Sequence, residues 1–253
     1  MARSGAKPAK YVYGVVPADS RARPKGSGIG GKSLRLVASG DLAAITSDVP
    51  DGPLEAGRDE LMAHSQVLAE TLDKTRAVLP MRFGVVMPDD DSVREELLDA
   101  FRPDLEAQLD EMDGKIEMNL KGIYDEAAVL REVVAENREI AALRQAISSA
   151  PPDAAYPERI RLGELVADAL NAKRESDAHA VLERLAPHAI AMEVNAPILD
   201  RMAVNAAFLL ERGGTESFDA ELERIAEENH PRIGFKLTGP LPPHSFVELA
   251  LEA

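Results

Sequence analysis

The chain has 253 residues, of which 45% are hydrophobic and 29% are charged, and this balance excludes disordered and fibrous proteins. Lys and Arg total 29 against 44 Asp and Glu, and the resulting net charge of −15 makes a nucleic-acid backbone an unfavourable partner. Cysteine is absent, which excludes disulfides, a thiolate nucleophile and a cysteine-based zinc site.

Positive charge gathers near the beginning of the sequence. The first 40 residues carry eight Lys and Arg against the single acid Asp19, so the remaining residues carry a net charge of −22. Residues 1–10 (MARSGAKPAK) lack the apolar stretch of a secretory signal, and we interpret them as a flexible basic tail. No apolar run approaches the roughly 20 residues that cross a bilayer, so we expect a cytoplasmic protein with no membrane partner.

The first part of the chain, residues 11–113, predicts a small α+β domain with a mixed sheet. Short apolar runs indicate strands, and a Gly-Asp turn at 40–41 joins two of them into a hairpin. Ser92 followed by Glu95 forms a capping box, which predicts a helix that starts at Val93 and kinks or restarts at Arg102-Pro103. In order, we expect a strand over 11–16, paired strands over 34–37 and 42–49, a helix over 55–76, a buried strand over 77–86 and a helix over 93–112.

Residues 26–33 read GSGIGGKS, which matches the pattern G-x-x-x-x-G-K-S of phosphate-binding loops. Such a loop binds phosphate when it runs from a buried strand directly into the N-terminus of a helix. Here residues 19–25 (DSRARPK) separate the loop from the preceding strand, and strand-like residues follow it. We therefore expect a loop that connects two strands. Its Lys32 and the basic neighbours Arg21, Arg23 and Lys25 contact either an acidic partner or only water. Nucleotide binding by Gly26 to Ser33 is the alternative function.

The second part, residues 114–253, predicts a ferredoxin-like domain of the split βαβ type with an enlarged helical hairpin at about 125–186. Apolar residues alternate with polar ones in four stretches and recur at helical spacing between them. The order of strand, two helices linked by a proline turn, two strands, helix and strand is that of a split βαβ arrangement. The predicted strands lie at 115–121, 190–194, 202–208 and 233–237, and the last helix at 218–226.

Candidate chemistry is sparse. The five histidines, at positions 64, 179, 188, 230 and 244, show no spacing typical of zinc, and we expect them in the core or on the surface. The acidic run Asp89-Asp90-Asp91 directly precedes a predicted helix, where acids cap the helix and favour its dipole, and it lacks the further oxygen ligands of a calcium loop. The sequence therefore predicts no enzyme, and no catalytic, cofactor-binding or metal-binding residue.

Residues 238–247 (TGPLPPHSFV) carry three prolines directly after a predicted strand, which fixes an extended path with few backbone donors. We expect a rigid chain end packed over the sheet, with a recognition surface as the other interpretation.

Several of these stretches together resemble the gas-vesicle protein family GvpF/GvpL. They occur in the order of the family over nearly the whole chain, and two departures stand in the closing motif, where Leu241 and His244 replace the usual aromatic residues. The matching pieces are YVYGVV (11–16), GIGG (28–31), LAAITSDV (42–49), VLPMRFG (78–84), NAAFLLER (205–212) with Phe218 beyond it, and TGPLPPHSFV (238–247).

The resemblance implies a non-enzymatic, minor component of gas vesicles, the gas-filled protein shells that give cells buoyancy. It implies two domains and a role in assembly, through association with the shell protein GvpA and with other accessory proteins, and it brings no catalytic residue, cofactor or small-molecule substrate. A third interpretation is a scaffold whose long helical hairpin pairs with partner helices.

Overall fold

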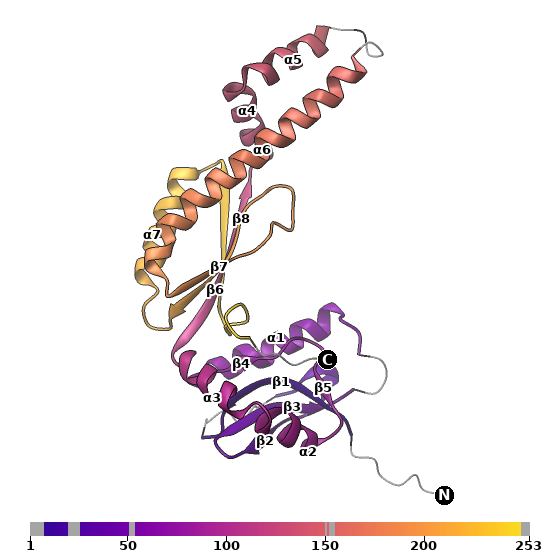
Figure 1. Cartoon of the computed structure of the whole chain (residues 1–253), viewed down its shortest axis with the longest axis vertical. Coiled ribbons are helices and arrows are strands. Elements are labelled where there is room, and N and C mark those ends of the chain that lie inside the picture. The colour runs from indigo at the N-terminus through magenta and orange to yellow at the C-terminus, as the bar shows by residue number, and fades with distance from the viewer. Residues whose placement is uncertain (1–7, 20–25, 51–53, 150, 152–154, 249–253) are drawn as a thin grey trace, which may run out of the picture. The chain divides into compact units, whose positions relative to one another are not determined.

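The computed structural model describes residues 8–19, 26–50, 54–149, 151 and 155–248 (Figure 1). Contacts divide the chain into two α+β units: the described residues up to Glu117 together with those from Gly239 on, and Met118–Thr238. The sequence predicts one boundary near residue 114 and places all of 114–253 in the second domain. The chain instead passes between the units twice, because its closing segment belongs to the first unit. Most of the predicted tail lies outside the described residues, and Lys10 already begins the first strand.

The sheet of the first unit is antiparallel in all of its recorded pairings, so the prediction of a mixed sheet is wrong. The strand order is β2-β3-β1-β4, and β5 also pairs with β1. The predicted hairpin is confirmed: Ser39 pairs with Leu42, and Gly40 takes a φ of 57° in the turn. The strands are β1 (Lys10–Pro17), β2 (Leu34–Ser39), β3 (Leu42–Asp48), β4 (Leu79–Pro80) and β5 (Val86–Met87).

The stretch 77–86, predicted as one strand, forms two short ones. Met81 N donates to Tyr13 O and Val12 N donates to Val85 O, so both ends of the stretch still bond β1. Between them Gly84 takes a φ of 98°, which turns the chain away from the ladder.

Of the two predicted helices of the first unit, the first is shorter at both ends than predicted, and the second begins earlier and is interrupted. Helix α1 spans Arg58–Leu72. The second predicted helix starts at Asp90, because the carboxylate of Asp89 accepts hydrogen bonds from Asp91 N and Ser92 N, so Ser92 is not the cap. It comprises α2 (Asp90–Ser92), the π-helical turn η2 (Val93–Asp99) and α3 (Arg102–Glu111), and the predicted restart at Pro103 is confirmed.

Two tyrosines of β1 organise the core of the first unit through their hydroxyl groups. Tyr11 and Tyr13 are both fully buried, with ring centroids 4.8 Å apart. His64 of α1 lies 2.9 Å from the hydroxyl of Tyr11 through Nδ1 and 3.2 Å from Met81 O through Nε2. Since a carbonyl oxygen only accepts, Nε2 carries the proton and Nδ1 accepts from Tyr11. Gly84 N completes this chain by donating to the Tyr11 hydroxyl at 3.1 Å.

The second unit contains a four-stranded sheet in the order β7-β8-β6-β9. Strand β8 lies between β6 and β7, as the split βαβ arrangement requires. Helices α6 and α7 cover one face of this sheet (Figure 1), and the rings of Phe208 and Phe218 meet there with centroids 4.9 Å apart. The elements are β6 (Lys115–Tyr124), α4 (Glu126–Glu136), α5 (Arg138–Ser149), α6 (Tyr156–Leu185), β7 (Ala191–Val194), β8 (Met202–Glu211), α7 (Glu216–Asn229) and β9 (Ile233–Leu241).

The helical enlargement contains three helices in place of the predicted two. Asn137 leaves helical geometry, with φ −115° and ψ 105°, and its side chain accepts from Glu139 N and Ile140 N to cap α5. Helix α6 continues for 30 residues through the polar stretch 173–177. Two ion pairs fix this polar stretch within the fold: Lys173 contacts Glu132 on α4 at 3.1 Å, and Asp177 pairs with Arg232.

Two side chains anchor the closing segment to the first unit. Ser245 donates to the buried carboxylate of Glu117 from its N–H at 2.7 Å and from its hydroxyl at 3.2 Å. The side-chain amide of Gln108 on α3 donates to Glu248 O at 2.9 Å and accepts from Glu248 N at 3.1 Å. Residues 238–241 continue strand β9, and residues 242–247 form the packed chain end that was expected for 238–247, with α3 and the start of β6 as its anchors.

Replacing Phe218 by Ala will destabilise the second unit, because it removes a fully buried ring from its contact with Phe208. The expected loss is about 3–5 kcal/mol in the free energy of unfolding, measured by urea titration. Ile198→Ala is the control, since Ile198 is 67% exposed and its truncation should change stability by less than about 0.5 kcal/mol. Equal effects of the two changes would contradict this account of the core.

The free energy of unfolding will fall as the pH drops from about 6.5 to about 4, partly because of His64. Burial, with a smaller contribution from the charge of His244, lowers the pKa of His64 to about 4. In this window the unfolded chain binds a proton at His64 and the folded protein does not, so acid favours unfolding, by up to about 3 kcal/mol.

This contribution is tested by urea titrations at several pH values. His64→Gln should be less stable at neutral pH yet lose less stability on acidification, whereas His179→Gln, at an exposed histidine, should follow the wild type. A His64→Gln variant as sensitive to acid as the wild type would refute the assignment.

Candidate functional site

The glycine-rich segment 26–33 forms a closed loop between two strands. Ser27 and Ser33 make a bridge across its base, and a single 3-10 turn, η1 (Ile29–Gly31), forms its tip. Strand β2 follows at Leu34, so no helix N-terminus points at this loop. The expectation of a connecting loop agrees with this geometry. The basic neighbours Arg21, Arg23 and Lys25 lie outside the described residues.

The backbone amides that would bind phosphate already have acceptors. Gly28 N donates to Lys32 O at 2.7 Å, Gly31 N to Gly28 O at 3.1 Å and Lys32 N to Ile29 O at 3.3 Å. Ile29 N donates to the buried hydroxyl of Tyr13 at 2.8 Å, and that hydroxyl also lies 3.0 Å from Ser47 Oγ. Phosphate binding would require these bonds to break, so the geometry does not favour the nucleotide alternative.

The acidic run at the start of α2 is used within the protein. Asp89 caps the helix, Asp90 lies 3.6 Å from Lys10 Nζ, and Asp91 accepts from Arg94 at 2.9 Å. Across the described part of the chain, no three His, Asp or Glu side chains gather in an arrangement that would hold a metal ion. The run therefore supports a structural role.

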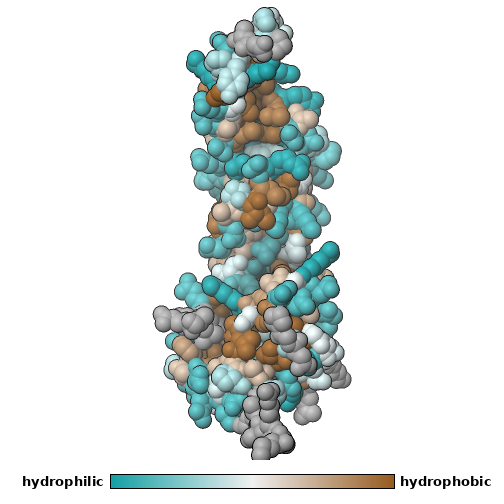
Figure 2. Space-filling view, turned by 90° about the vertical axis from the view of Figure 1, so that its right-hand side faces the viewer, coloured by the Kyte–Doolittle hydropathy of each residue, from teal (hydrophilic) through white to brown (hydrophobic). Residues whose placement is uncertain are grey.

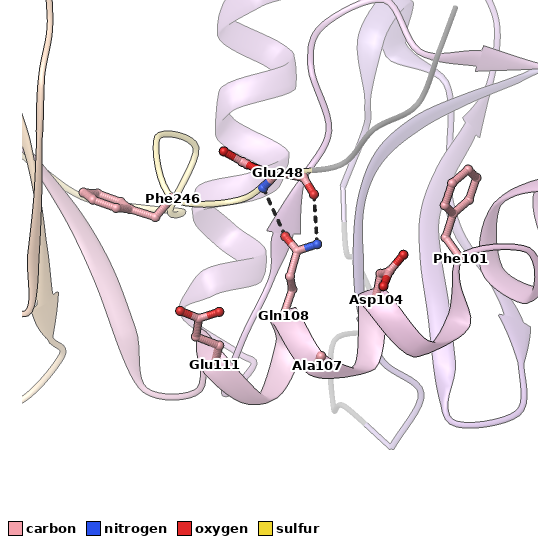
Figure 3. A pocket seen from close by; sticks show the side chains of 7 residues that line it. All are labelled: Phe101, Asp104, Ala107, Gln108, Glu111, Phe246 and Glu248. Atoms are coloured by element: carbon pink, nitrogen blue, oxygen red, sulfur yellow. Dashed lines mark hydrogen bonds between the residues drawn. The ribbon is translucent and has the colours of Figure 1, made fainter.

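An open pocket of ≈ 460 Å³ lies beside the anchored closing segment (Figure 3). Its polar groups are carboxylates, and the amide of Gln108, which is already bonded to the backbone of Glu248. With neither a hydroxyl nucleophile nor a basic side chain among its lining residues, it supports no catalytic assignment. The lining residues are Phe101, Asp104, Ala107, Gln108, Glu111, Phe246 and Glu248.

The edge strand β7 is the surface best suited to bind a partner. It ends the sheet order, and among the described strands it pairs only with β8. Asn195 N donates to Asn205 O at 2.8 Å, and since backbone groups alternate in direction along a strand, Glu193 and Ala191 also face β8. The alternation ends at Ala191, because Ile190 N also donates to β8, to Leu209 O at 2.8 Å. Met192 and Val194 therefore present their N–H and C=O groups to the open side.

Exposed apolar side chains surround this edge. Within residues 190–199 (IAMEVNAPIL) the single charge is Glu193. On the face drawn in Figure 2, hydrophobic side chains form separate patches bordered by hydrophilic ones. Four large apolar residues of the segment are about half exposed or more, namely Ile190 at 48%, Val194 at 56%, Ile198 at 67% and Leu199 at 56%. We call residues 190–199 the β7 edge.

The other sheet edges carry the features that usually prevent strand addition. Strand β2 exposes Arg35, which pairs with Asp48, and β9 exposes Lys236 and Pro240. The β7 edge has neither lysine nor proline within its strand, and its protections are its shortness and the charge of Glu193. Period-two alternation predicted this strand, and the predicted split βαβ order puts it at the end of the sheet, but the pattern could not show that the apolar side chains around it stay exposed.

None of the helices among the described residues is long and apolar enough to cross a bilayer. The structure thus offers two types of candidate: polar groups already used within the fold, and an apolar strand edge without a partner strand in the described structure. Of these two types, the second is the one available to another molecule without breaking a bond of the fold.

Comparison with known proteins agrees with the sequence resemblance. The family model described as gas vesicle synthesis protein GvpL/GvpF matches residues 9–248. Gas vesicle protein F of Streptomyces sp. (strain CB03234) is 39% identical over 94% of this chain and 99% of its own length. Gas vesicle protein L of the same organism is 31% identical over 96% of this chain and 94% of its own length.

The fold is also that of solved GvpF structures. The crystal structure of GvpF from Anabaena sp. PCC7120 superposes with a TM-score of 0.81 at 22% identity, covering 96% of this chain and all of that one. GvpF from Microcystis aeruginosa gives a TM-score of 0.76, also at 22% identity. At this identity the likeness establishes the fold alone, and the sequence match establishes the family. The chain belongs to the gas vesicle synthesis protein GvpL/GvpF family, and its role lies in gas vesicles.

Proposed function

We propose that this protein is a non-enzymatic accessory component of gas vesicles that binds the shell protein GvpA and other accessory proteins during assembly. It resides with the vesicle in the cytoplasm and keeps shell subunits from aggregating before they are incorporated. The observation that carries this proposal is the β7 edge, an apolar strand edge exposed on a strongly acidic protein.

A shell protein that assembles through apolar surfaces and strand edges attracts its own copies before assembly. The β7 edge offers backbone groups of Met192 and Val194 to an incoming strand, and apolar side chains on both sides of it. Addition of a strand at such an edge satisfies the backbone groups of both partners and covers the apolar residues of both. This supports temporary binding of an extended shell segment.

The charge of the protein supports the second part of the proposal. A net charge of −15 keeps a complex dispersed, because acidic complexes repel one another. The β7 edge carries a single charge, so binding there leaves the acidic surface exposed to solvent.

The non-enzymatic part of the proposal is supported by how the polar groups are used. His64 bonds Tyr11 and Met81 O within the core, and the glycine loop bonds its own backbone and Tyr13. The carboxylates of the pocket face no nucleophile among the residues that line it.

Val194→Lys will weaken the binding of GvpA several-fold, because it places a charge at the centre of the β7 edge and opposes strand addition. The measurement is the fraction of GvpA that stays soluble on co-expression, together with co-purification of the complex. Val86→Lys is a matched control, since Val86 is a 43% exposed valine on the short strand β5 of the other unit. If the wild type neither keeps GvpA soluble nor co-purifies with it, the proposed function is wrong. If the wild type binds GvpA and Val194→Lys binds it equally well, the function stands but its assignment to the β7 edge is wrong.

Isothermal titration with ATP or GTP in the presence of magnesium should show no saturable binding, because the amides of the glycine loop are already bonded. The control is Lys32→Ala. Saturable binding in the wild type that is lost in Lys32→Ala would favour the nucleotide alternative over the present proposal.

A further inference from the structure

The second half of the helical enlargement forms an arm of two helices. It consists of α5 and the first part of α6, residues 156–172, and we call it the arm; it extends beyond the sheet of its unit (Figure 1). The two helices bury one seam between them, with Ile140 fully buried and Leu162, Leu165 and Val166 half-buried. Arg161 and Glu139 pair across the seam. One face of α6 is left uncovered.

That uncovered face carries an uncharged stripe. Tyr156, Ile160, Gly163 and Ala167 follow one another at spacings of four, three and four residues, which is the spacing of a coiled-coil seam. All four are exposed, Tyr156 at 68% and Ile160 at 48%. Figure 2 shows hydrophobic side chains gathered on the arm, at the top of the picture, with hydrophilic ones beside them.

Gly163 has no role in packing within the chain. A Cβ atom added there would meet nothing within 4 Å, and the residue lies inside a 30-residue helix. Glycine in a helix interior costs about 1 kcal/mol relative to alanine, and its use is to let another backbone approach closely. This observation is independent of the apolar side chains, and it indicates a second helix on the same stripe.

The charges beside the stripe identify the second helix. Arg159 and Glu164 flank it on opposite sides and are five residues apart, the separation at which the g position of one helix meets the e position of a parallel partner. Both are exposed, and neither forms an ion pair with another described residue in the structure. Two copies of α6 aligned in parallel would place Arg159 of each beside Glu164 of the other.

The net charge of the arm removes the main obstacle to such pairing. Four arginines are balanced by four acids within 138–149 and 156–172, whereas the whole chain stands at −15. Self-association is therefore opposed by repulsion elsewhere on the protein but not on the arm. The positively charged residues are Arg138, Arg144, Arg159 and Arg161, and the acids are Glu139, Glu158, Glu164 and Asp168.

We infer that the arm joins two copies of this chain into a parallel dimer through the stripe of Tyr156, Ile160, Gly163 and Ala167. Arg159 and Glu164 form two symmetry-related ion pairs across the two-fold axis. The stripe is short, so the dimer is weak and forms at high local concentration. This association is separate from the binding of a shell segment at the β7 edge, and each surface can be removed without the other.

Sedimentation velocity of the full chain, over roughly a hundredfold range of concentration, tests the dimer. The wild type should shift from monomer to dimer, and Arg159→Glu or Glu164→Arg should each weaken the dimer about tenfold, since each creates two like-charge contacts. The double variant Arg159→Glu/Glu164→Arg restores opposite charges and should restore the dimer. A wild type that stays monomeric throughout, or a double variant no better than the single ones, would overturn the proposal.

Gly163 gives a test that separates pairing from folding. Gly163→Ala should raise the stability of the monomer, because alanine favours helix, and weaken the dimer, because the added methyl groups meet at the seam. Ala180→Gly, a change at an exposed position of the same helix away from the stripe, should lower stability and leave association unchanged. A Gly163→Ala variant that dimerises as well as the wild type contradicts close pairing at this stripe.

Discussion

The first unit depends on two buried tyrosine hydroxyls. Each ring lies in the core, so its hydroxyl must be hydrogen-bonded, and the required partners come from four separate segments of the chain. Tyr11 bonds His64 of α1 and Gly84 N of the turn, while Tyr13 bonds Ile29 N of the glycine loop and Ser47 of β3. Burial raises the pKa of both hydroxyls, that of Tyr11 to about 12, so both stay protonated at neutral pH. Four of the stretches that resemble the family, at 11–16, 28–31, 42–49 and 78–84, thus meet around these two tyrosines, which gives their residue types a structural reason.

A layer of charged residues plays the corresponding part in the second unit. Arg232 bonds Glu132 of α4 at 2.7 Å and pairs with Asp177 of α6, whose carboxylate also accepts from the hydroxyl of Tyr124 at 2.5 Å. These partners are on different elements, so the polar middle of α6 is fixed to the sheet and to α4. Because this part of α6 is held, the helix can continue outwards as one piece and support the arm.

The sequence predicts the strands and helices where a pattern is local. Alternation predicted β6, β7, β8 and β9, and the order of strands and helices along the chain predicted the order of the second sheet, although β8 is buried on both of its faces. The pattern cannot show which of two nearby residues caps a helix, so Ser92 was predicted where Asp89 is the cap. It also missed the helix break at Asn137, because the apolar stripe continues through that position. Nor can it show long-range bonds: Glu117 and Gln108 draw the closing segment back to the first unit across more than a hundred positions. The exposure of the apolar side chains of the β7 edge was likewise not visible in the pattern.

The same charge that keeps the protein dispersed also restricts where it can bind. With 29% of residues charged and a net charge of −15, most contacts between acidic surfaces begin with repulsion. The β7 edge, with one charge in ten residues, and the arm, with equal numbers of both signs, are exceptions. They differ in what they present: β7 offers free backbone groups, which accept an extended strand, whereas α6 has bonded its backbone internally and offers side chains alone. A strand partner and a helix partner are therefore not in competition, and a dimer joined at the arm would carry two β7 edges.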